Sequence, residues 1–152
     1  MQAVTGPMAG TRLALLPIEH TTWDDWQSRH PESKVLSDQT GIPRNYAANP
    51  YEGYENHEKT FFPISHEDTR LSRKSWVLGV TVGGKAKAYA FERLAKEPGS
   101  LRDQVGGKTI IVRYDPKNRS AIITDAQGVA VPSVQAYWFA WAAFHPETEL
   151  FF

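Results

Sequence analysis

The chain has 152 residues, of which 41 % are hydrophobic and 12 % aromatic, enough for one domain with a packed core. Lys plus Arg and Asp plus Glu both number 17, and this zero net charge argues against a nucleic-acid partner, because phosphate binding needs a basic excess. The lack of cysteine excludes disulfides and thiolate chemistry, and no apolar run approaches the ~20 residues that span a bilayer.

The first predicted unit covers residues 11–38 and consists of a strand, a helix and a second strand. The apolar run Leu13–Leu16 predicts the first strand, and Ser33–Leu36 predicts the second. Between them, threonines that can cap a helix precede two tryptophans three residues apart, which a helix places on one face. Pro31 is expected to end this helix at His30, because the residue before a proline disfavours the α conformation.

Residues 39–72 differ from the rest of the chain, since they show neither helical nor strand periodicity. Structureless loops longer than about 12–15 residues are uncommon in compact domains unless they are functional or disordered. Disordered segments are usually poor in aromatic residues, whereas this segment carries Tyr46, Tyr51, Tyr54, Phe61 and Phe62. We therefore predict an ordered loop that lies against its own domain, a partner or a ligand.

The strand block, residues 74–131, is predicted to be an antiparallel meander built from two hairpins, with a short helix within Phe91–Leu101 between them. The paired runs are Val77–Val82 with Lys85–Phe91, and Thr109–Tyr114 with Ser120–Thr124. Gly83-Gly84 predicts a two-residue turn in the first hairpin, because both turn positions need a positive φ.

A second unit, about residues 129–152, repeats the first at an offset of 115 residues. A proline, two tryptophans and a His-Pro-Glu sequence recur: Pro17, Trp23, Trp26, His30, Pro31 and Glu32 match Pro132, Trp138, Trp141, His145, Pro146 and Glu147. In this copy we expect Ser133 to cap a helix that runs to about Phe144. Its composition is far more apolar, which predicts a surface helix in the first unit and a buried one here.

These elements predict an α+β fold within a single domain, residues 1–152. We expect an antiparallel β-sheet or a partly closed barrel, with the two tryptophan-bearing helices packed on it. The internal repeat predicts that the two units are related by a pseudo-twofold axis, and that the second helix is the hub of the core. Because the tryptophan and His-Pro residues recur, they are interpreted as architecture, and chemistry is sought in residues that do not recur.

Several motifs resemble the DUF3179 family, a bacterial and archaeal domain of unknown function. They run through nearly the whole chain: Gly6-Pro7-Met8-Ala9-Gly10-Thr11-Arg12-Leu13, Leu16-Pro17, His20-Thr21-Thr22-Trp23, His30-Pro31, Phe62-Pro63-Ile64-Ser65-His66, Asp68, Arg70-Leu71, Val77-Leu78-Gly79-Val80, Ala86 to Tyr89, Val105-Gly106-Gly107, Tyr114-Asp115-Pro116 and Trp138 to Pro146. Longer members of the family carry an earlier copy of the strand block, so the resemblance implies either that the chain corresponds to their C-terminal portion or that it is a standalone protein with the degenerate copy alone. It also favours a periplasmic or extracellular location.

The resemblance does not imply a specific reaction. The resemblance implies that the earlier copy of the strand block in longer members typically has a Cys-Pro-x-Cys segment where this chain has Tyr114-Asp115-Pro116-Lys117-Asn118, and a histidine where this chain has Phe91–Leu101. This chain lacks both features, so cysteine-based chemistry of that kind is not expected of it.

His66, Asp68 and Arg70 alternate along the chain, so an extended backbone would point them to one side. The histidine and aspartate are residue types that ligate metals or act as acid and base near an anion held by the arginine. His20 and His57 would supply further ligands if the fold brought them together. The alternative is a local network in which Asp68 pairs with Arg70 or caps a turn, since two ligands are too few for a convincing metal site.

Tyr46, Tyr51 and Tyr54 are the second group of candidate binding residues. They are interpreted as an aromatic platform for a sugar, a peptide or a flat ligand, or alternatively as rings that pin their own loop. No metal ligand set and no cofactor motif is identified.

Two functions remain open from the sequence. The first is a non-catalytic binding or accessory domain that uses the loop at residues 39–72 and associates with a second copy or another protein through an exposed apolar face. The second is a metal-dependent or general acid/base enzyme centred on His66, Asp68 and Arg70.

Overall fold

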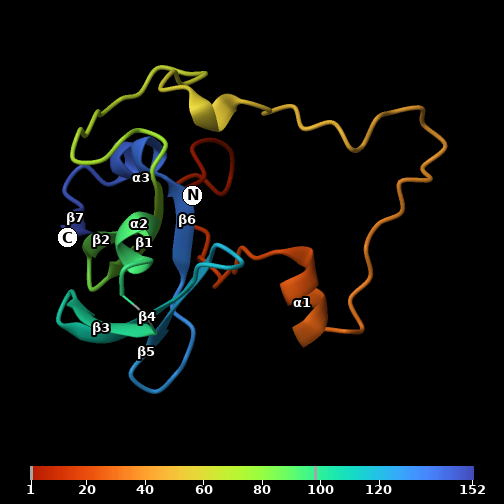
Figure 1. The fold of residues 1–152 in the computed structure, drawn as a ribbon. Coiled ribbons are helices and arrows are strands. Elements are labelled where there is room, and N and C mark those ends of the chain that lie inside the picture. The colour runs from red at the N-terminus through yellow and green to blue at the C-terminus, as the bar shows by residue number, and fades with distance from the viewer. Residues whose placement is uncertain (1, 98) are drawn as a thin grey trace.

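A computed structural model describes residues 2–97 and 99–152 (Figure 1). The chain forms helices α1 (Trp23–Arg29), α2 (Phe91–Leu94) and α3 (Trp138–Phe144), a short 3-10 helix (Tyr54–Asn56), and strands β1 (Trp76–Val82), β2 (Lys85–Ala90), β3 (Ser100–Val105), β4 (Lys108–Asp115), β5 (Ser120–Asp125), β6 (Ser133–Tyr137) and β7 (Glu149–Phe151). The α+β class predicted from the sequence is confirmed.

The strands form two sheets rather than one. The four-stranded sheet has the order β6-β1-β2-β7, in which β6 is antiparallel to β1 and β7 is parallel to β2. The three-stranded sheet, β3-β4-β5, is antiparallel throughout. The strands within residues 2–97 and 99–152 close no barrel, so the predicted alternative of a partly closed barrel is wrong.

Both predicted hairpins form. Gly83 and Gly84 have φ of 56° and 77°, the left-handed conformations that a two-residue hairpin turn requires. Between the hairpins, helix α2 ends at Leu94, and a strand that the sequence analysis missed, β3, begins at Ser100 and pairs with β4. The strand gave no clear signal because its centre, Arg102-Asp103-Gln104, is polar.

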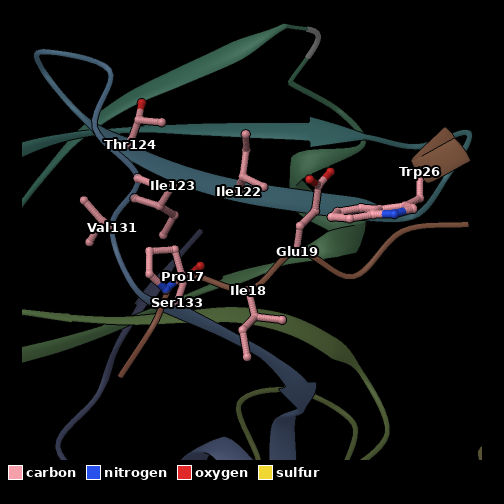
Figure 2. Close-up of a pocket in the computed structure, with 10 residues that line it drawn as sticks. Pro17, Ile18, Glu19, Trp26, Ile122, Ile123, Thr124, Val131 and Ser133 are labelled. Carbon is pink, nitrogen blue, oxygen red and sulfur yellow. The ribbon is translucent and has the colours of Figure 1, made fainter. Parts of the chain in front are cut away.

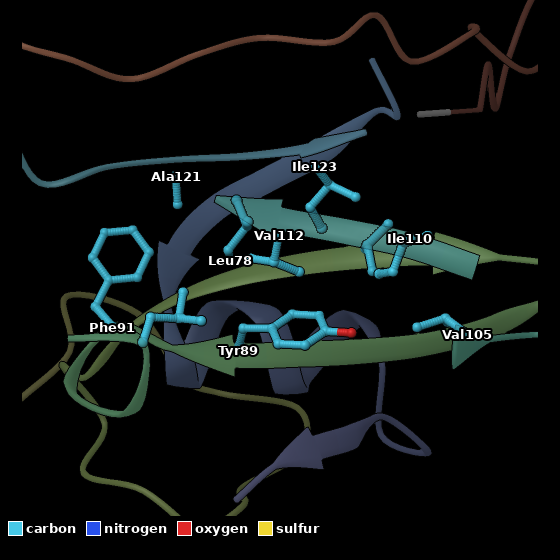
Figure 3. Close-up of a cluster of buried hydrophobic side chains, with 10 residues drawn as sticks. Leu78, Tyr89, Phe91, Val105, Ile110, Val112, Ala121 and Ile123 are labelled. Atoms are coloured by element: carbon cyan, nitrogen blue, oxygen red, sulfur yellow. The ribbon is translucent and has the colours of Figure 1, made fainter. Parts of the chain in front are cut away.

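The main core lies between the two sheets (Figure 3). Leu78 and Val80 of β1 and Tyr89 of β2 face strands β4 and β5, which contribute Ile110, Val112, Ala121 and Ile123. Alternate residues of the same two central strands, among them Val77, Ala88 and Ala90, face the other way and pack against α3. The β1–β2 hairpin is therefore the middle layer of three, buried on both faces.

Helix α3 is buried, as its apolar composition predicts: Trp138, Trp141 and Ala142 lie in the second core cluster. It begins at Trp138 with Tyr137 as its N-cap, so the prediction that Ser133 caps the helix is wrong. Residues 133–137 instead extend along β1 as β6. Trp141 packs directly on Gly79 of β1, where a Cβ atom would overlap the indole ring.

Helix α1, unlike α3, is not part of a core cluster. It buries no residue, and in Figure 1 it lies to one side of the sheets, joined to the 3-10 helix by a long arc of chain that runs clear of both sheets. The predicted strands at Leu13–Leu16 and Ser33–Leu36 do not form, since neither segment has a partner strand within the described residues. An isolated extended segment has no ladder hydrogen bonds to stabilise it.

The contact between Gly79 and Trp141 predicts that Gly79→Ala destabilises the fold by about 1–3 kcal/mol, because the added methyl group overpacks the interface. The free energy of unfolding in urea measures this. Thr81→Ala, on an exposed position of the same strand, is the control and is expected to change stability by less than about 0.5 kcal/mol. An unchanged unfolding midpoint for Gly79→Ala would contradict the packing described here.

Candidate functional site

The aromatic loop is fastened to the body of the protein by Lys74, which lies two residues before β1. The Lys74 ammonium donates a hydrogen bond to the carbonyl oxygen of Tyr54 and lies 2.9 Å from the centroid of the Tyr54 ring. Tyr137 and Phe139 place their rings within 5.8 Å of the same ammonium. Lys74 is only 9 % exposed, so these cation–π contacts act in a largely desolvated setting, where they are strongest.

This lysine was not singled out from the sequence. The sequence signal is its spacing, because Lys74 is in phase with the alternate residues Trp76, Leu78 and Val80 of β1, although it lies in the turn before that strand. A lysine in phase with core residues is expected to find a special environment, here the carbonyl and ring of Tyr54.

Tyr51, Tyr54 and Phe61 form an aromatic cluster in the loop. The rings of Tyr54 and Phe61 stack with centroids 4.2 Å apart, and the Tyr51 ring lies 6.5 and 6.3 Å from them. Tyr54 also contacts Tyr137 edge-on, which connects the cluster to β6. One side of the cluster therefore packs on the body, while Tyr51 and Phe61 remain exposed on the other.

A cavity of about 720 Å³ opens beside these rings. Its lining combines the three rings with polar side chains from the same loop, namely Pro50, Tyr51, Glu52, Tyr54, His57, Glu58, Lys59, Thr60 and Phe61. Rings that fix a face and a few polar groups around it are the usual composition of a small-molecule site. We refer to this group of nine residues as the aromatic cavity.

The third predicted tyrosine lies elsewhere. Tyr46 shares a hydrogen bond with the hydroxyl of Thr40, and its ring lies 5.9 Å from the Arg44 guanidinium. It does not line the aromatic cavity, so the sequence-based platform of three tyrosines divides into Tyr51 and Tyr54 at the cavity and Tyr46 outside it.

Asp68 and Arg70 pair with each other, which is the local network that the sequence analysis gave as the alternative. Both oxygens of the Asp68 carboxylate accept hydrogen bonds from Arg70, and the same guanidinium donates to the carbonyl oxygen of Thr148. Arg70 also lies 5.3 Å from the Trp138 ring, whose N–H donates to the Asp68 carbonyl. The pair therefore joins the loop to Trp138, the first residue of α3, and to Thr148, the residue before β7.

The hydrogen bonds from Arg70 hold the pKa of the Asp68 carboxyl below its usual value. They likewise raise the pKa of Arg70, so both groups stay charged at neutral pH. His66 lies beside them in an open, polar depression lined also by Glu67 and Glu147. In this arrangement the carboxylate is occupied by an arginine, which leaves it poorly placed to remove a proton from a substrate.

His20, His57 and His66 do not converge. Within residues 2–97 and 99–152, no three His, Asp or Glu side chains lie close enough together to hold a metal ion. His57 lines the aromatic cavity instead, and His66 lies in the depression beside Asp68. The metal-dependent hypothesis gains no support from this geometry.

Large apolar side chains are exposed mainly in the first part of the chain. Those with at least 60 % of their surface accessible before residue 45 are Val4, Met8, Leu13, Leu15, Leu16, Ile18, Val35, Leu36 and Ile42. None of the helices in the described part of the chain is long and apolar enough to cross a membrane. Any proposal about a partner must account for these exposed apolar residues.

The Asp68–Arg70 pair predicts a pH-dependent loss of stability in Asp68→Asn. Because the folded pKa lies below the unfolded value of about 3.9, the stabilisation is present above about pH 4 and is lost as the pH falls through the folded pKa. The variant should be less stable by about 1 kcal/mol at pH 7, and the difference should shrink below pH 4.

Urea unfolding of both proteins between pH 7 and pH 3 measures this difference. Glu67→Gln is the matched control, because Glu67 pairs with Arg73 but is half exposed. A gap between wild type and Asp68→Asn that stays constant with pH would show that the charge of Asp68 is not what stabilises the loop.

The position of Lys74 predicts that Lys74→Met releases the aromatic loop while the sheets stay folded. Removing the charge should speed amide hydrogen exchange in residues 50–61 about five- to tenfold, the equivalent of about 1–1.4 kcal/mol of cation–π stabilisation. Mass spectrometry resolves the loop from strands β1 to β5. Lys85→Met, at the exposed end of the hairpin, should leave loop exchange unchanged.

A family model described as "Protein of unknown function (DUF3179)" matches residues 1–131. No curated protein and no solved structure matches the chain. The matched range contains the aromatic loop, Lys74 and the strands up to β5, while β6, α3 and β7 follow it. With most of its length covered, the chain belongs to the DUF3179 family, as its sequence motifs predict.

Proposed function

We propose that this protein is a non-catalytic binding and accessory domain whose ligand site is the aromatic cavity. The observation that carries the proposal is the exposed pair Tyr51 and Phe61 beside a cavity of about 720 Å³, on a loop that Lys74 fastens to the sheet. Exposed rings cost solvation free energy, and a rigid mounting reduces the entropy lost when a ligand binds. Both features are what a preorganised binding surface needs.

The polar residues around the rings favour a saccharide as the ligand. A sugar ring presents C–H groups on a flat face and hydroxyl groups at its edge. The ring faces of Tyr51 and Phe61 can stack on the C–H groups of the sugar. The carboxylates of Glu52 and Glu58 can accept hydrogen bonds from its hydroxyl groups. Lys59 and His57 add donors at the same rim. An openly accessible site suits an extended chain of sugars better than a buried small molecule.

The acid/base hypothesis is less well supported than the binding hypothesis. Its central carboxylate, Asp68, already accepts three side-chain hydrogen bonds from Arg70, and both residues join the loop to the α3 segment. These contacts favour a structural role for the pair. The aromatic cavity, in contrast, has the exposed rings of Tyr51 and Phe61 beside polar side chains of the same loop.

The accessory role rests on the exposed apolar residues of the N-terminal part of the chain. Helix α1 buries no residue, although it carries two tryptophans, and Val35 and Leu36 beyond it are exposed. A second polypeptide that covers them would remove this apolar surface from water. Either a second copy of the chain or a different protein would satisfy that requirement.

The saccharide proposal predicts that a panel of immobilised oligosaccharides retains the wild-type protein and that Tyr51→Ala/Phe61→Ala abolishes retention. Losing two stacking rings should weaken binding at least about fivefold, since each ring contributes about 0.5–1.5 kcal/mol. Titration of the best glycan by calorimetry measures the affinity of both proteins. Urea unfolding checks that the double variant remains folded.

Tyr46→Ala is the matched control, because Tyr46 is an exposed tyrosine of the same loop that does not line the cavity. It should bind glycans as the wild type does. Failure of every glycan to bind, or equal binding by the double variant, would refute a saccharide site at these rings.

A further inference from the structure

The two repeated segments have the same local structure, and we name them by residue. The N-terminal Trp motif is residues 18–36, and the C-terminal Trp motif is residues 133–151. Their seven-residue helices, α1 and α3, begin and end at matching positions. The residues after the helices, His30 and His145, have φ and ψ of −134° and 67° in one motif and −136° and 66° in the other.

The side chains repeat the agreement. Trp26 stacks on His30 with ring centroids 4.0 Å apart, and Trp141 stacks on His145 at 3.9 Å. Each indole N–H then donates a 2.9 Å hydrogen bond to a hydroxyl seven residues later, on Ser33 or Thr148. Two segments that agree in backbone and Trp-His geometry direct their corresponding positions toward a neighbour in the same way.

The two motifs differ in how far the rest of the protein buries them. In the C-terminal motif, β6 adds to β1, β7 adds to β2, and Trp138 and Leu150 are 0 % and 7 % exposed. Their counterparts Trp23 and Val35 are 43 % and 67 % exposed. Residues 18–22 and 34–36, which match β6 and β7, pair with no strand in the described part of the chain.

A cleft of about 440 Å³ lies where the cover would be (Figure 2). It is lined by Pro17, Glu19 and Trp26 of the N-terminal side, together with Ala130. The corresponding residues of the second copy, Pro132, Val134 and Trp141, line a pocket with Leu15, the counterpart of Ala130. Each pocket is therefore completed by residues of the other unit: Leu15 at Trp141, and Ala130, Val131 and Ser133 at Trp26.

The two pockets differ in which strand forms the wall beside the tryptophan ring. Gly79 and Thr81 of β1 line the C-terminal pocket, and the Gly79 backbone lies directly against the Trp141 ring. Within residues 2–97 and 99–152, the strands that line the cleft at Trp26 are β5 and the start of β6, and neither β1 nor a glycine lies in its wall. The missing element is a strand with a bare backbone beneath the indole.

We propose that the N-terminal Trp motif binds a β-hairpin of a partner polypeptide, built like β1–β2. Residues 18–22 add antiparallel to its first strand and residues 34–36 add parallel to its second, as β6 and β7 do on their hairpin. A glycine of the first strand lies under Trp26. This inference rests on the accessory role proposed above and names the partner's chemistry.

The sequence of the motif adds a detail about the partner. Gln27 stands where the fully buried Ala142 packs against Ala88 and Ala90. A hairpin that covers Gln27 must leave room for its side chain and offer its amide a hydrogen-bond partner. The indole N–H of Trp23 also needs an acceptor, as Trp138 has in the Asp68 carbonyl.

A second folded copy of this chain is a poor source of the hairpin. Its β1 and β2 edges are already taken by its own β6 and β7, and those contacts would have to be given up. A hairpin of a different polypeptide with both edges unpaired would bind without giving up such contacts. Self-association is therefore an outcome that counts against the proposal.

The test fuses a second copy of residues 74–91 to the N-terminus of the full chain through a flexible Gly/Ser linker, which supplies the hairpin at millimolar effective concentration. Amide hydrogen exchange of residues 18–22 and 34–36 should slow at least about tenfold relative to the unfused chain. Introducing Gln27→Ala into the chain should slow it further, because alanine restores the packing seen at Ala142.

The matched control carries Gly79→Leu in the added copy alone, which places a side chain under Trp26 and should abolish the protection. Protection that survives this change, or no protection in either the wild-type or the Gln27→Ala background, would overturn the proposal. So would sedimentation showing that the unfused chain dimerises and protects the same amides. These amides lie outside the aromatic cavity, so the result is independent of the saccharide test.

Discussion

The fold depends on the bare backbone of Gly79. Because β1 has no side chain at this position, the Trp141 ring lies directly on the strand and α3 comes close enough to cover the hairpin. The indole is fixed in turn by its stack on His145 and its hydrogen bond to Thr148, which leads the chain into β7. One contact thus sets the distance of the helix and the position of the last strand. The opposite face of the same hairpin supports the three-stranded sheet.

A polar junction connects this core to the aromatic loop. Lys74 lies just before β1 and holds Tyr54, while Asp68 and Arg70 contact Trp138, the first residue of α3, and Thr148, the residue before β7. The loop is therefore fastened at points that the packing of α3 already fixes. On its exposed side, Phe61 stacks on Tyr54, so the rings at the cavity are connected to these fixed points. A long loop without regular structure can in this way present rings at defined positions.

The sequence predicted what local rules determine. The Gly83-Gly84 turn, the buried α3 and the aromatic character of the loop all follow from residue types and spacing. It did not predict β3, whose polar residues carry no periodic signal, or the extended conformation at Ser133, which β1 imposes by pairing. Leu13–Leu16 and Ser33–Leu36 have the composition of strands, yet a strand forms only where another backbone accepts its hydrogen bonds.

The candidate site shows the same division. Tyr51 and Tyr54 were identified from composition, but the separation of Tyr46 from them depends on the path of the loop, which no periodicity encodes. Lys74 escaped notice because its role requires Tyr54 and Tyr137, which are distant in sequence. The pairing of Asp68 with Arg70 was foreseen as one of two alternatives, since residues two apart can meet without help from the rest of the fold.

The order of strands in the four-stranded sheet has a consequence for biosynthesis. The β1–β2 hairpin leaves the ribosome well before β6 and β7, which flank it on either side in the finished sheet. Until then both of its outer edges expose unpaired N–H and C=O groups beside apolar residues such as Val77 and Ala88, a combination that promotes misassociation of nascent chains. Translation speed across the intervening segment, and the chaperones that meet it there, therefore bear on how much protein reaches the native state.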